Sequence, residues 1–266
     1  MSDQPQHEHV SESHSEARCY FVRSRNALAV RACFGPIFTD YYLHLMQHSL
    51  KLEPEHDRIF KHALAAFTLY LASRPWKEIT AWTANFQDPL FNLFVTGNSL
   101  AGNVSGRVFT KDVKHQETSK LYSQVTTEGQ ETRQSIIEFD GSNFFDIAER
   151  FHLQSDQRLA RFFNHSGDDY VLVAAQPDCD TAWLKSLTPE LIRTLDEQEE
   201  LSLLESRRYR FHCGCDTARV VAALSPLSTA QLDELFDSRQ TIPVTCPRCA
   251  ALFELTRDEI EASRQS

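Results

Sequence analysis

Four cysteines in the last fifth of the chain are the residues best suited to chemistry. Cys213 and Cys215 flank a single glycine, and Cys246 and Cys249 form a Cys-x-x-Cys motif after a gap of thirty residues. A Cys-x-x-Cys turn between two strands is a common half of a tetrahedral zinc site, which a second pair of thiolates can complete. The spacing therefore predicts one Zn²⁺ ion bound by Cys213, Cys215, Cys246 and Cys249.

The same four thiols are also suited to redox chemistry. Zinc keeps its sulfur ligands as thiolates, and the thiolate is the form that oxidants attack. Each pair is close enough in sequence to close its own disulfide once zinc leaves, and a Cys-x-Cys disulfide closes a small, strained ring that is readily reduced again. Zinc binding contributes on the order of 10–16 kcal/mol to the folding of small domains, so its loss should unfold this unit. The residues alone fit both a purely structural zinc site and a switch.

Composition narrows the class of protein. The chain has 266 residues, of which 41% are hydrophobic and 11% aromatic, as in globular proteins with a substantial core. No apolar run approaches the ~20 residues that span a bilayer. The formal net charge of −10 argues against nucleic acid or an anionic membrane as the main partner. The amino-terminal segment lacks the basic and apolar regions of a signal peptide, which predicts a cytoplasmic protein with reduced thiols.

Four segments are expected along the chain. Residues 1–17 are polar and acidic and predict a disordered tail. Residues 18–177 mix helix and strand patterns without a regular alternation, which predicts an α+β core domain. Residues 178–210 are rich in Leu, Glu and Arg and predict a helical, marginally stable linker. Residues 211–266 form a unit with too little core to be securely stable without its metal.

Local patterns place the elements of the core domain. Apolar residues at helical spacing predict a helix from Pro54 to about Ser73 and a weaker one over residues 40–50. Strand patterns cover residues 77–86, 89–99 and 134–142. A helix capped by Ser142 is expected to reach Leu153, and a hairpin over residues 158–176 is expected to turn at Ser166–Asp169.

The carboxyl-terminal unit is marked by capping signals. Asp216 is expected to cap one short helix, and the capping boxes Ser228 with Gln231 and Thr256 with Glu259 are expected to open two more. Strands are expected to lead into and out of the second thiol pair. The thiols would thus lie at the junctions of short elements.

Other polar and aromatic residues receive structural assignments. His212 adjoins the first thiol pair, but four sulfurs complete a tetrahedron, so a role at the surface is expected. The tail histidines are expected to be solvated, Cys19 and Cys33 to be small buried hydrophobes, and the tryptophans to lie in the core or an interface. Cys179 stands where the linker begins and could become exposed when the linker moves. The histidines and tryptophans concerned are His7, His9, His14, Trp76, Trp82 and Trp183.

The thiol arrangement resembles a known family. "FHCGCD", thirty residues and then "TCPRCA" is similar to the redox-regulated heat-shock chaperones of bacteria, the thirty-three-kilodalton chaperonin family. "RYRFHCGCD" resembles the start of that family's zinc domain, and "LTPELIRTLDEQEELSLL" resembles its linker. Weaker similarity continues upstream through "DPLFNLFVTGNSLAGNVSGR" and "SIIEFDGSNFFDIAERFHLQSDQRLARFF".

The resemblance implies an ATP-independent holdase rather than an enzyme. The reduced, zinc-bound form would be inactive. Oxidation would release zinc and form disulfides between Cys213 and Cys215 and between Cys246 and Cys249. The zinc domain and linker would then unfold and expose apolar surface on the core domain, which would bind unfolding or oxidatively damaged client proteins. The resemblance also implies a homodimer when oxidised and a hand-over of clients to an ATP-dependent foldase system.

Two other classes of function compete with this interpretation. A thiol–disulfide oxidoreductase could use Cys246 and Cys249, although no βαβ framework follows the motif. A zinc-ribbon adaptor could bind a protein or nucleic acid, although the acidity of the chain disfavours the nucleic acid. We find no phosphate-binding loop, Ser-His-Asp order or convincing acid pair in the sequence.

Overall fold

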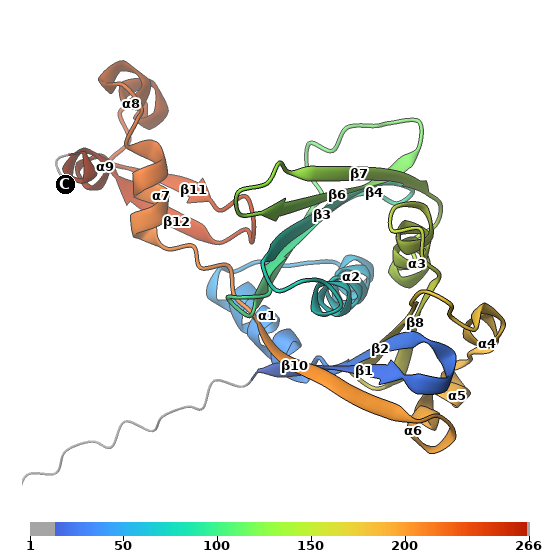
Figure 1. Cartoon of the computed structure of the whole chain (residues 1–266). Helices are drawn as coiled ribbons and strands as arrows, with labels where there is room; N and C mark the ends of the chain where they lie inside the picture. Colours follow the sequence, from blue (N-terminus) through green and yellow to red (C-terminus); the bar gives the residue numbers. More distant parts are fainter. Residues whose placement is uncertain (1–13, 265–266) are drawn as a thin grey trace, which may run out of the picture.

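Helix α2 (Pro54–Ala72) lies at the centre of the fold, between two halves of a curved sheet (Figure 1). The computed structural model describes residues 14–264. Every residue from Ala63 to Ala72 is buried, so the second half of α2 is surrounded by protein on all sides. The predicted helix is confirmed, and Pro54 stands in its first turn, where a missing N–H is tolerated.

Ten strands form the sheet, in the order β7-β6-β3-β4-β5-β10-β1-β2-β9-β8. Neighbouring strands are antiparallel except β5 and β10, which run parallel over two residue pairs. The two halves are therefore joined at β10. The strands are β1 (Ser15–Val22), β2 (Ala27–Cys33), β3 (Glu78–Gln87), β4 (Leu90–Asn98), β5 (Asn103–Phe109), β6 (Ser119–Thr127), β7 (Arg133–Phe139), β8 (Ala160–Ser166), β9 (Asp169–Ala175) and β10 (Leu201–Phe211).

The expected strands and the hairpin of the core domain are confirmed as β3, β4, β7 and β8–β9. Strands β1, β2, β5 and β6 are additional to those that the sequence patterns predict. The weaker helix is α1 (Gly35–Gln47), which begins five residues earlier than expected, with Pro36 in its first turn. Helix α3 (Phe144–Gln154) is capped by Asn143 rather than Ser142, because the Asn143 side chain accepts a hydrogen bond from the Phe145 amide.

The linker is only partly helical. Three short helices, α4 (Thr181–Ser186), α5 (Pro189–Arg193) and α6 (Leu195–Gln198), precede β10, so the expectation of helix up to residue 210 is wrong for its last ten residues. Arg207, Tyr209 and Phe211 alternate with more exposed neighbours, which is the two-residue period of a half-buried strand. The linker thus ends as a strand of the main sheet.

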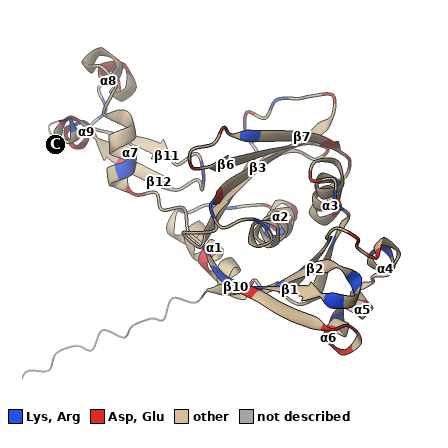
Figure 2. Cartoon of the chain, in the orientation of Figure 1, with Lys and Arg blue, Asp and Glu red and all other residues tan. Residues whose placement is uncertain are grey.

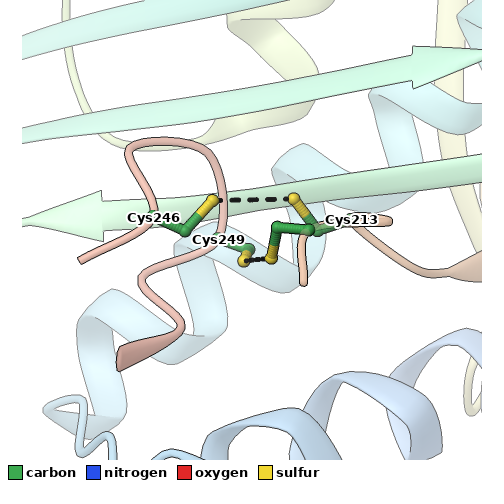
Figure 3. A group of neighbouring side chains, drawn as sticks. Cys213, Cys246 and Cys249 are labelled. Atoms are coloured by element: carbon green, nitrogen blue, oxygen red, sulfur yellow. Dashed lines mark hydrogen bonds between the residues drawn. The ribbon is translucent and has the colours of Figure 1, made fainter. Parts of the chain in front are cut away.

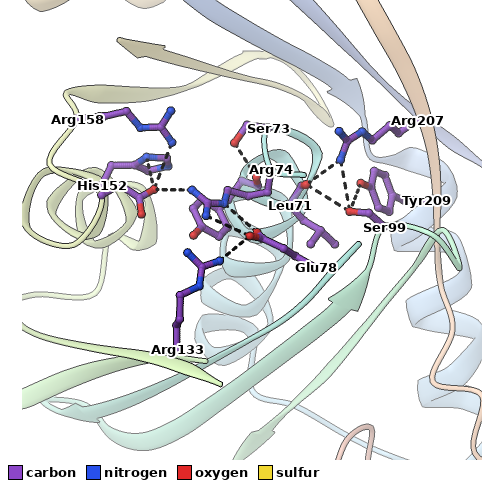
Figure 4. A network of polar contacts seen from close by, with 12 residues as sticks. Leu71, Ser73, Arg74, Glu78, Ser99, Arg133, His152, Arg158, Arg207 and Tyr209 are labelled. Atoms are coloured by element: carbon purple, nitrogen blue, oxygen red, sulfur yellow. Dashed lines mark hydrogen bonds and ion pairs between the residues drawn. The ribbon is translucent and has the colours of Figure 1, made fainter. Parts of the chain in front are cut away.

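Polar contacts attach the linker to the core. Arg25, the last residue of the short 3-10 turn η1 (Arg23–Arg25), pairs with Asp180 at 2.8 Å and with Glu199 at 2.9 Å. Figure 2 shows these basic residues of the β1–β2 connection close to the acidic end of α6. Further along β10, the Arg207 guanidinium donates to the Leu71 carbonyl at 3.3 Å, at the end of α2 (Figure 4). Charge pairs at one end of β10 and a buried arginine in its middle thus hold the linker in place.

The start of the chain is ordered earlier than expected. Residues 1–13, which include His7 and His9, lie outside the described residues. Ser15–Ala17 belong to β1 and pair with β10, so the predicted disordered tail does not extend to residue 17. Ser15–Ala17 form a strand because β10 supplies a partner strand from the far end of the sequence.

The carboxyl-terminal unit extends from the main sheet beyond Phe211 (Figure 1). It contains α7 (Thr217–Leu224), α8 (Thr229–Phe236), α9 (Arg257–Ser263) and the hairpin β11 (Thr241–Thr245) with β12 (Leu252–Thr256). The cap at Asp216 and both predicted capping boxes are present. Its core consists of a few side chains: Val221, Leu232, Phe236, Ile242, Leu255 and Ile260. The predicted α+β architecture is confirmed.

Among residues 14–264, no helix is both long enough and apolar enough to cross a membrane.

Candidate metal centre

The four cysteines converge where β10 leads into the carboxyl-terminal unit (Figure 3). Their sulfurs all lie within 4.8 Å of one another. The Cys213 and Cys246 sulfurs are 3.8 Å apart, and those of Cys215 and Cys249 are 3.4 Å apart. Four sulfurs at about 2.3 Å from a zinc ion in a tetrahedron lie about 3.8 Å from each other. The donor set and its spacing therefore fit one tetrahedral thiolate-bound metal.

Backbone geometry aims both thiol pairs at the same point. Cys213 lies two residues after the end of β10, and Gly214 has a φ of 69°, a left-handed conformation that glycine adopts without strain. On the other side the Cys246 amide donates to the Ala251 carbonyl at 2.8 Å, and the Ala250 amide donates to the Cys246 carbonyl at 3.0 Å. These bonds close the Cys-x-x-Cys turn at the end of the β11–β12 hairpin.

A cation would stabilise the four cysteines of the cluster as thiolates. The pKa of Cys213 is lowered to about 5, first by a hydrogen bond from the Cys249 thiol and also by the charge of Arg248. The pKa of Cys215 is raised to about 12, chiefly by burial, and that of Cys249 is raised by its bond to Cys213 and by burial. One thiolate is thus stabilised at the expense of its neighbours. A divalent cation would remove this conflict by compensating the charge of all four.

Most of the other expected assignments hold. His212 is exposed and is not part of the sulfur cluster. Cys19 is buried, and burial raises the pKa of its thiol to about 11, so it is a weakly reactive core residue. Cys33 is exposed at the end of β2, and the expectation that it is buried is wrong. Cys179 is half-buried at the start of the linker.

The remaining candidates lie away from the cluster. His14 is described and partly buried just before β1. Trp82 is fully buried in the core, and Trp183 packs against the cluster of apolar residues under the linker. Trp76 is 41% exposed, with the Arg207 guanidinium 4.4 Å from its ring centroid.

Three core-domain residues reach the metal loop, and the sequence patterns do not predict them. His44 on α1, His48 at the carboxyl-terminal cap of α1 and Arg107 on β5 contact the backbone of Cys249, Leu252 and Cys246, respectively. The two histidines are four residues apart, so they share a face of α1, which is the signal the sequence offers. It indicates neither the partner nor the arginine, because the contacting segments are more than 130 residues apart.

Comparisons with known proteins support the resemblance. The model of the family described as "Hsp33 protein" matches residues 169–256, which include part of the last core hairpin, the linker and all four thiols. The 33 kDa chaperonin of Edwardsiella ictaluri is 26% identical over 165 residues, which are 53% of this chain and 56% of the relative. The 33 kDa chaperonin of Nitrosococcus oceani is 22% identical over 177 residues, 56% of this chain and 61% of the relative.

Residues 169–256 of this chain thus match the Hsp33 family. In these two alignments the chain spans little more than half the length of the relatives. The fold agrees over a wider range, because the crystal structure of the 33 kDa chaperonin (heat shock protein 33 homologue) of Thermotoga maritima superposes with a TM-score of 0.72. That likeness covers 95% of this chain and 98% of the Thermotoga chain at 13% sequence identity, and it shows a shared fold.

Proposed function

We propose that this protein is an ATP-independent holdase that oxidation of its four clustered thiols switches on. The observation that carries the proposal is the convergence of all four sulfurs within 4.8 Å at the end of β10, a strand that joins the two halves of the core sheet. The four thiols thus lie beside β10, so a change in their oxidation state would act next to the strand that joins the two halves of the main sheet.

We assign Zn²⁺ as the resident metal, held by Cys213, Cys215, Cys246 and Cys249. Bound zinc would keep the four sulfurs as thiolates and tie β10 to the β11–β12 hairpin. An all-sulfur tetrahedral site suits zinc, and zinc does not itself change oxidation state, so electrons for a redox switch would come from the sulfurs. Because the core of the carboxyl-terminal unit is small, folding of this unit would depend on the four sulfur–zinc bonds.

Oxidation would convert each thiolate pair to a disulfide. With peroxide as oxidant, two thiolates lose two electrons and form one S–S bond, while one peroxide molecule takes up the electrons and two protons to give two waters. A disulfide carries no charge and is a poor metal ligand, so the thiols would give up the cation. We propose the pairings Cys213 with Cys215 and Cys246 with Cys249.

The linker covers the apolar surface that the switched protein would use. Leu184, Leu187, Ile192 and Leu195 are buried against a face of β2 and β9 that includes Ala29, Val171 and Val173. If the linker detached, this face would become a continuous apolar patch, and such patches on soluble proteins bind other proteins. We propose that unfolding or oxidatively damaged proteins bind there, and that the linker masks the site in the reduced form.

The proposal also covers the location of the protein, its oligomeric state and the hand-over of its clients. A thiolate cluster that must be reduced at rest suits the cytoplasm. An oxidised homodimer and hand-over of clients to an ATP-dependent foldase follow from the family and belong to the proposal. We propose no catalytic residue.

The test follows metal, thiols and chaperone activity in the same samples. Reduced protein and protein treated with peroxide at mildly elevated temperature are assayed for bound zinc, free thiols and suppression of aggregation of a thermally unfolding client. We expect zinc loss and suppression only after oxidation. The Cys246→Ser variant should bind little zinc even when reduced, whereas Cys33→Ser, at an exposed thiol outside the cluster, should behave as the parent protein. Oxidised protein that has lost zinc but leaves aggregation unchanged would refute the chaperone assignment.

A further inference from the structure

The loop between the two strands of the β11–β12 hairpin rests on the core domain through three side chains. The Arg107 guanidinium donates to the Cys246 carbonyl at 3.1 Å, and His44 Nε2 lies 2.7 Å from the Cys249 carbonyl. The Leu252 amide donates to His48 Nδ1 at 3.3 Å. All three bonds go to the backbone of the segment that carries the second thiol pair, which we call the metal loop (Cys246–Leu252).

The chemistry of each contact is defined by its partner. A carbonyl oxygen only accepts, so His44 must carry its proton on Nε2. An amide N–H only donates, so Nδ1 of His48 must be unprotonated. Arg107 can only donate. Two donors, His44 and Arg107, and one acceptor, His48, thus bind the loop. All three hydrogen bonds go to backbone atoms of the loop.

Aromatic rings hold the three side chains in position. The His44 ring lies 5.5 Å from the Phe211 ring at the end of β10, and 4.8 Å from the His48 ring. The Arg107 guanidinium lies 4.2 Å from the centroid of Phe109, its neighbour on the same side of β5. The three groups are therefore supported by α1, β5 and β10, which belong to the core domain.

A cavity of about 290 Å³ lies between α1 and the Cys213–Cys215 turn, with His44, His48 and Phe211 in its lining. The hydrogen bonds of His44, His48 and Arg107 to the loop backbone therefore lie at the edge of an open space. A contact of this kind is sensitive to the conformation of the loop, because a small change in the turn misplaces its carbonyls.

We propose that His44, His48 and Arg107 form a docking site through which the core domain senses whether the metal loop is folded. The Cys246 and Cys249 carbonyls point to the docking site only while the Cys-x-x-Cys turn keeps its closed form. When the thiols release the metal, the loop leaves the site, and Phe211 loses the His44 contact that the docked loop stabilises. The state of the thiols is thereby transmitted to the carboxyl end of β10.

Docking and metal binding must support each other by linkage. If the folded, metal-bound loop docks and the open loop does not, removal of the docking contacts must weaken metal retention to the same extent. The inference rests on the metal site of the proposed function and is independent of client binding.

The test uses the full-length, zinc-loaded, reduced chain. His44→Phe keeps a ring beside Phe211 and removes the donor, whereas His44→Gln keeps a donor near the position of Nε2. Arg107→Met keeps the aliphatic stem and removes the guanidinium. His115→Phe, at an exposed histidine far from the loop in sequence, is the matched control. The readouts are hydrogen exchange at the Cys246 and Ala250 amides and the rate of zinc transfer to a chromogenic chelator.

We expect His44→Phe and Arg107→Met each to raise both rates about fivefold, the effect of one hydrogen bond of ordinary strength. His44→Gln should stay within about twofold of the parent chain, and His115→Phe should match it. Parental rates in His44→Phe and Arg107→Met, with zinc content intact, would overturn the docking site. So would His44→Gln behaving as His44→Phe, since the donor would then be irrelevant.

A second comparison separates this inference from the proposed function. Chelation of zinc from the reduced parent chain should raise hydrogen exchange in α1 around His44 and in β5 around Arg107, whether or not the protein suppresses aggregation. Unchanged exchange at both places after complete zinc removal would contradict the docking site. Loss of chaperone activity alone would contradict only the function.

Discussion

The four sulfurs are arranged for a metal rather than for a particular disulfide. The shortest sulfur contacts cross between the pairs, from Cys213 to Cys246 and from Cys215 to Cys249. Proximity in the folded centre therefore does not favour the pairings that we propose. Those pairings depend on the loosened unit, in which residues two or three apart in sequence meet far more often than residues thirty apart.

The disulfide pairing can be read directly from tryptic peptides of the oxidised protein. Cleavage after Arg210 and Arg219 releases both thiols of the first pair on one peptide, whereas cleavage after Arg248 separates Cys246 from Cys249. We expect an internally closed peptide over residues 211–219 and a linked pair of peptides over 240–248 and 249–257. A link between 211–219 and either of the others would show that the pairs cross. Non-reducing mass mapping, with a reduced sample beside it, distinguishes the outcomes.

His152 on α3 makes the fold sensitive to acid. It is fully buried, and burial, together with the charges of Arg158 and Arg74, lowers the pKa of its ring to about 3 (Figure 4). Its Nδ1 lies 3.5 Å from a carboxylate oxygen of Asp156, which cannot offset the desolvation of a charged ring. The unfolded chain binds a proton at about pH 6.5, while the folded chain excludes it until about pH 3.

Stability should therefore be present in full above pH 6.5 and be lost as pH falls toward 3. The slope between these values is about 1.4 kcal/mol of unfolding free energy per pH unit from this residue. His152→Phe should remove that slope. Urea unfolding of both chains at pH 7.5, 6.0 and 5.0, with zinc content checked in each sample, measures the difference. Parallel losses of stability in the two chains would show that His152 does not set the acid sensitivity.

At the scale of elements, β10 is the strand on which the two halves of the sheet depend. It pairs with β1 over most of its length, but with β5 only at Arg210 and Phe211. The Arg210 amide also donates to the Gly102 carbonyl at 3.0 Å, in the turn before β5. The β5–β10 junction is therefore narrow, and it ends two residues before Cys213.

Gly102 is placed to test this junction. Its φ is 59°, and a Cβ at this position would lie 2.6 Å from the Arg208 carbonyl oxygen. Gly102→Ala should therefore push β10 away from β5, with a cost of about 1–3 kcal/mol beyond that of the left-handed backbone. Gly129→Ala is the matched control, because Gly129 has a φ of 73° with nothing within 4 Å of its Cβ position. Trypsin cleavage at Arg208 and Arg210 should accelerate in Gly102→Ala and change little in Gly129→Ala.

The same strand shows what could be predicted from the sequence and what could not. Helix α2 and the hairpin β8–β9 are predictable because their signals, an apolar face and a turn, are local. Residues 201–211 carry Leu203 and Leu204, which are 57% and 58% exposed, so the apolar pattern at the start of β10 does not mark its buried face. The strand forms because β1, nearly two hundred residues earlier, offers an edge, and tertiary pairing of this kind overrides local propensity.

The candidate site likewise contains residues that the sequence predicts and residues that it does not predict. Short spacings predicted the four thiols and the helix caps beside them, because Cys-x-Cys, Cys-x-x-Cys and capping boxes are local patterns. The docking side chains His44 and Arg107 meet the metal loop only in three dimensions. The position of Cys33 at an exposed strand end likewise depends on where β2 stops.

At the scale of the whole molecule, the two parts differ in how they are stabilised. The core domain buries one large apolar cluster around α2, whereas the carboxyl-terminal unit buries six side chains and its thiols. Removal of the metal should therefore unfold the carboxyl-terminal unit first. Strand β10 should remain in place at that stage, because its pairing with β1, the Arg207 contacts and the Arg25 ion pairs do not involve the metal.

Metal loss and release of the linker should thus be separable steps. After chelation under reducing conditions at 25 °C, hydrogen exchange should rise sharply across residues 213–264, while the amides of residues 201–209, which pair with β1, keep their protection. Mild heating of the chelated protein should then expose β10 and the apolar face under α4–α6, because the metal centre no longer adds to the strand pairing, the Arg25 and Arg207 contacts and the apolar packing that hold the linker. Zinc-loaded protein heated in parallel should keep both regions protected. Simultaneous loss of protection in residues 201–211 and 213–264 on chelation alone would show that the metal centre, rather than the sheet, holds the linker.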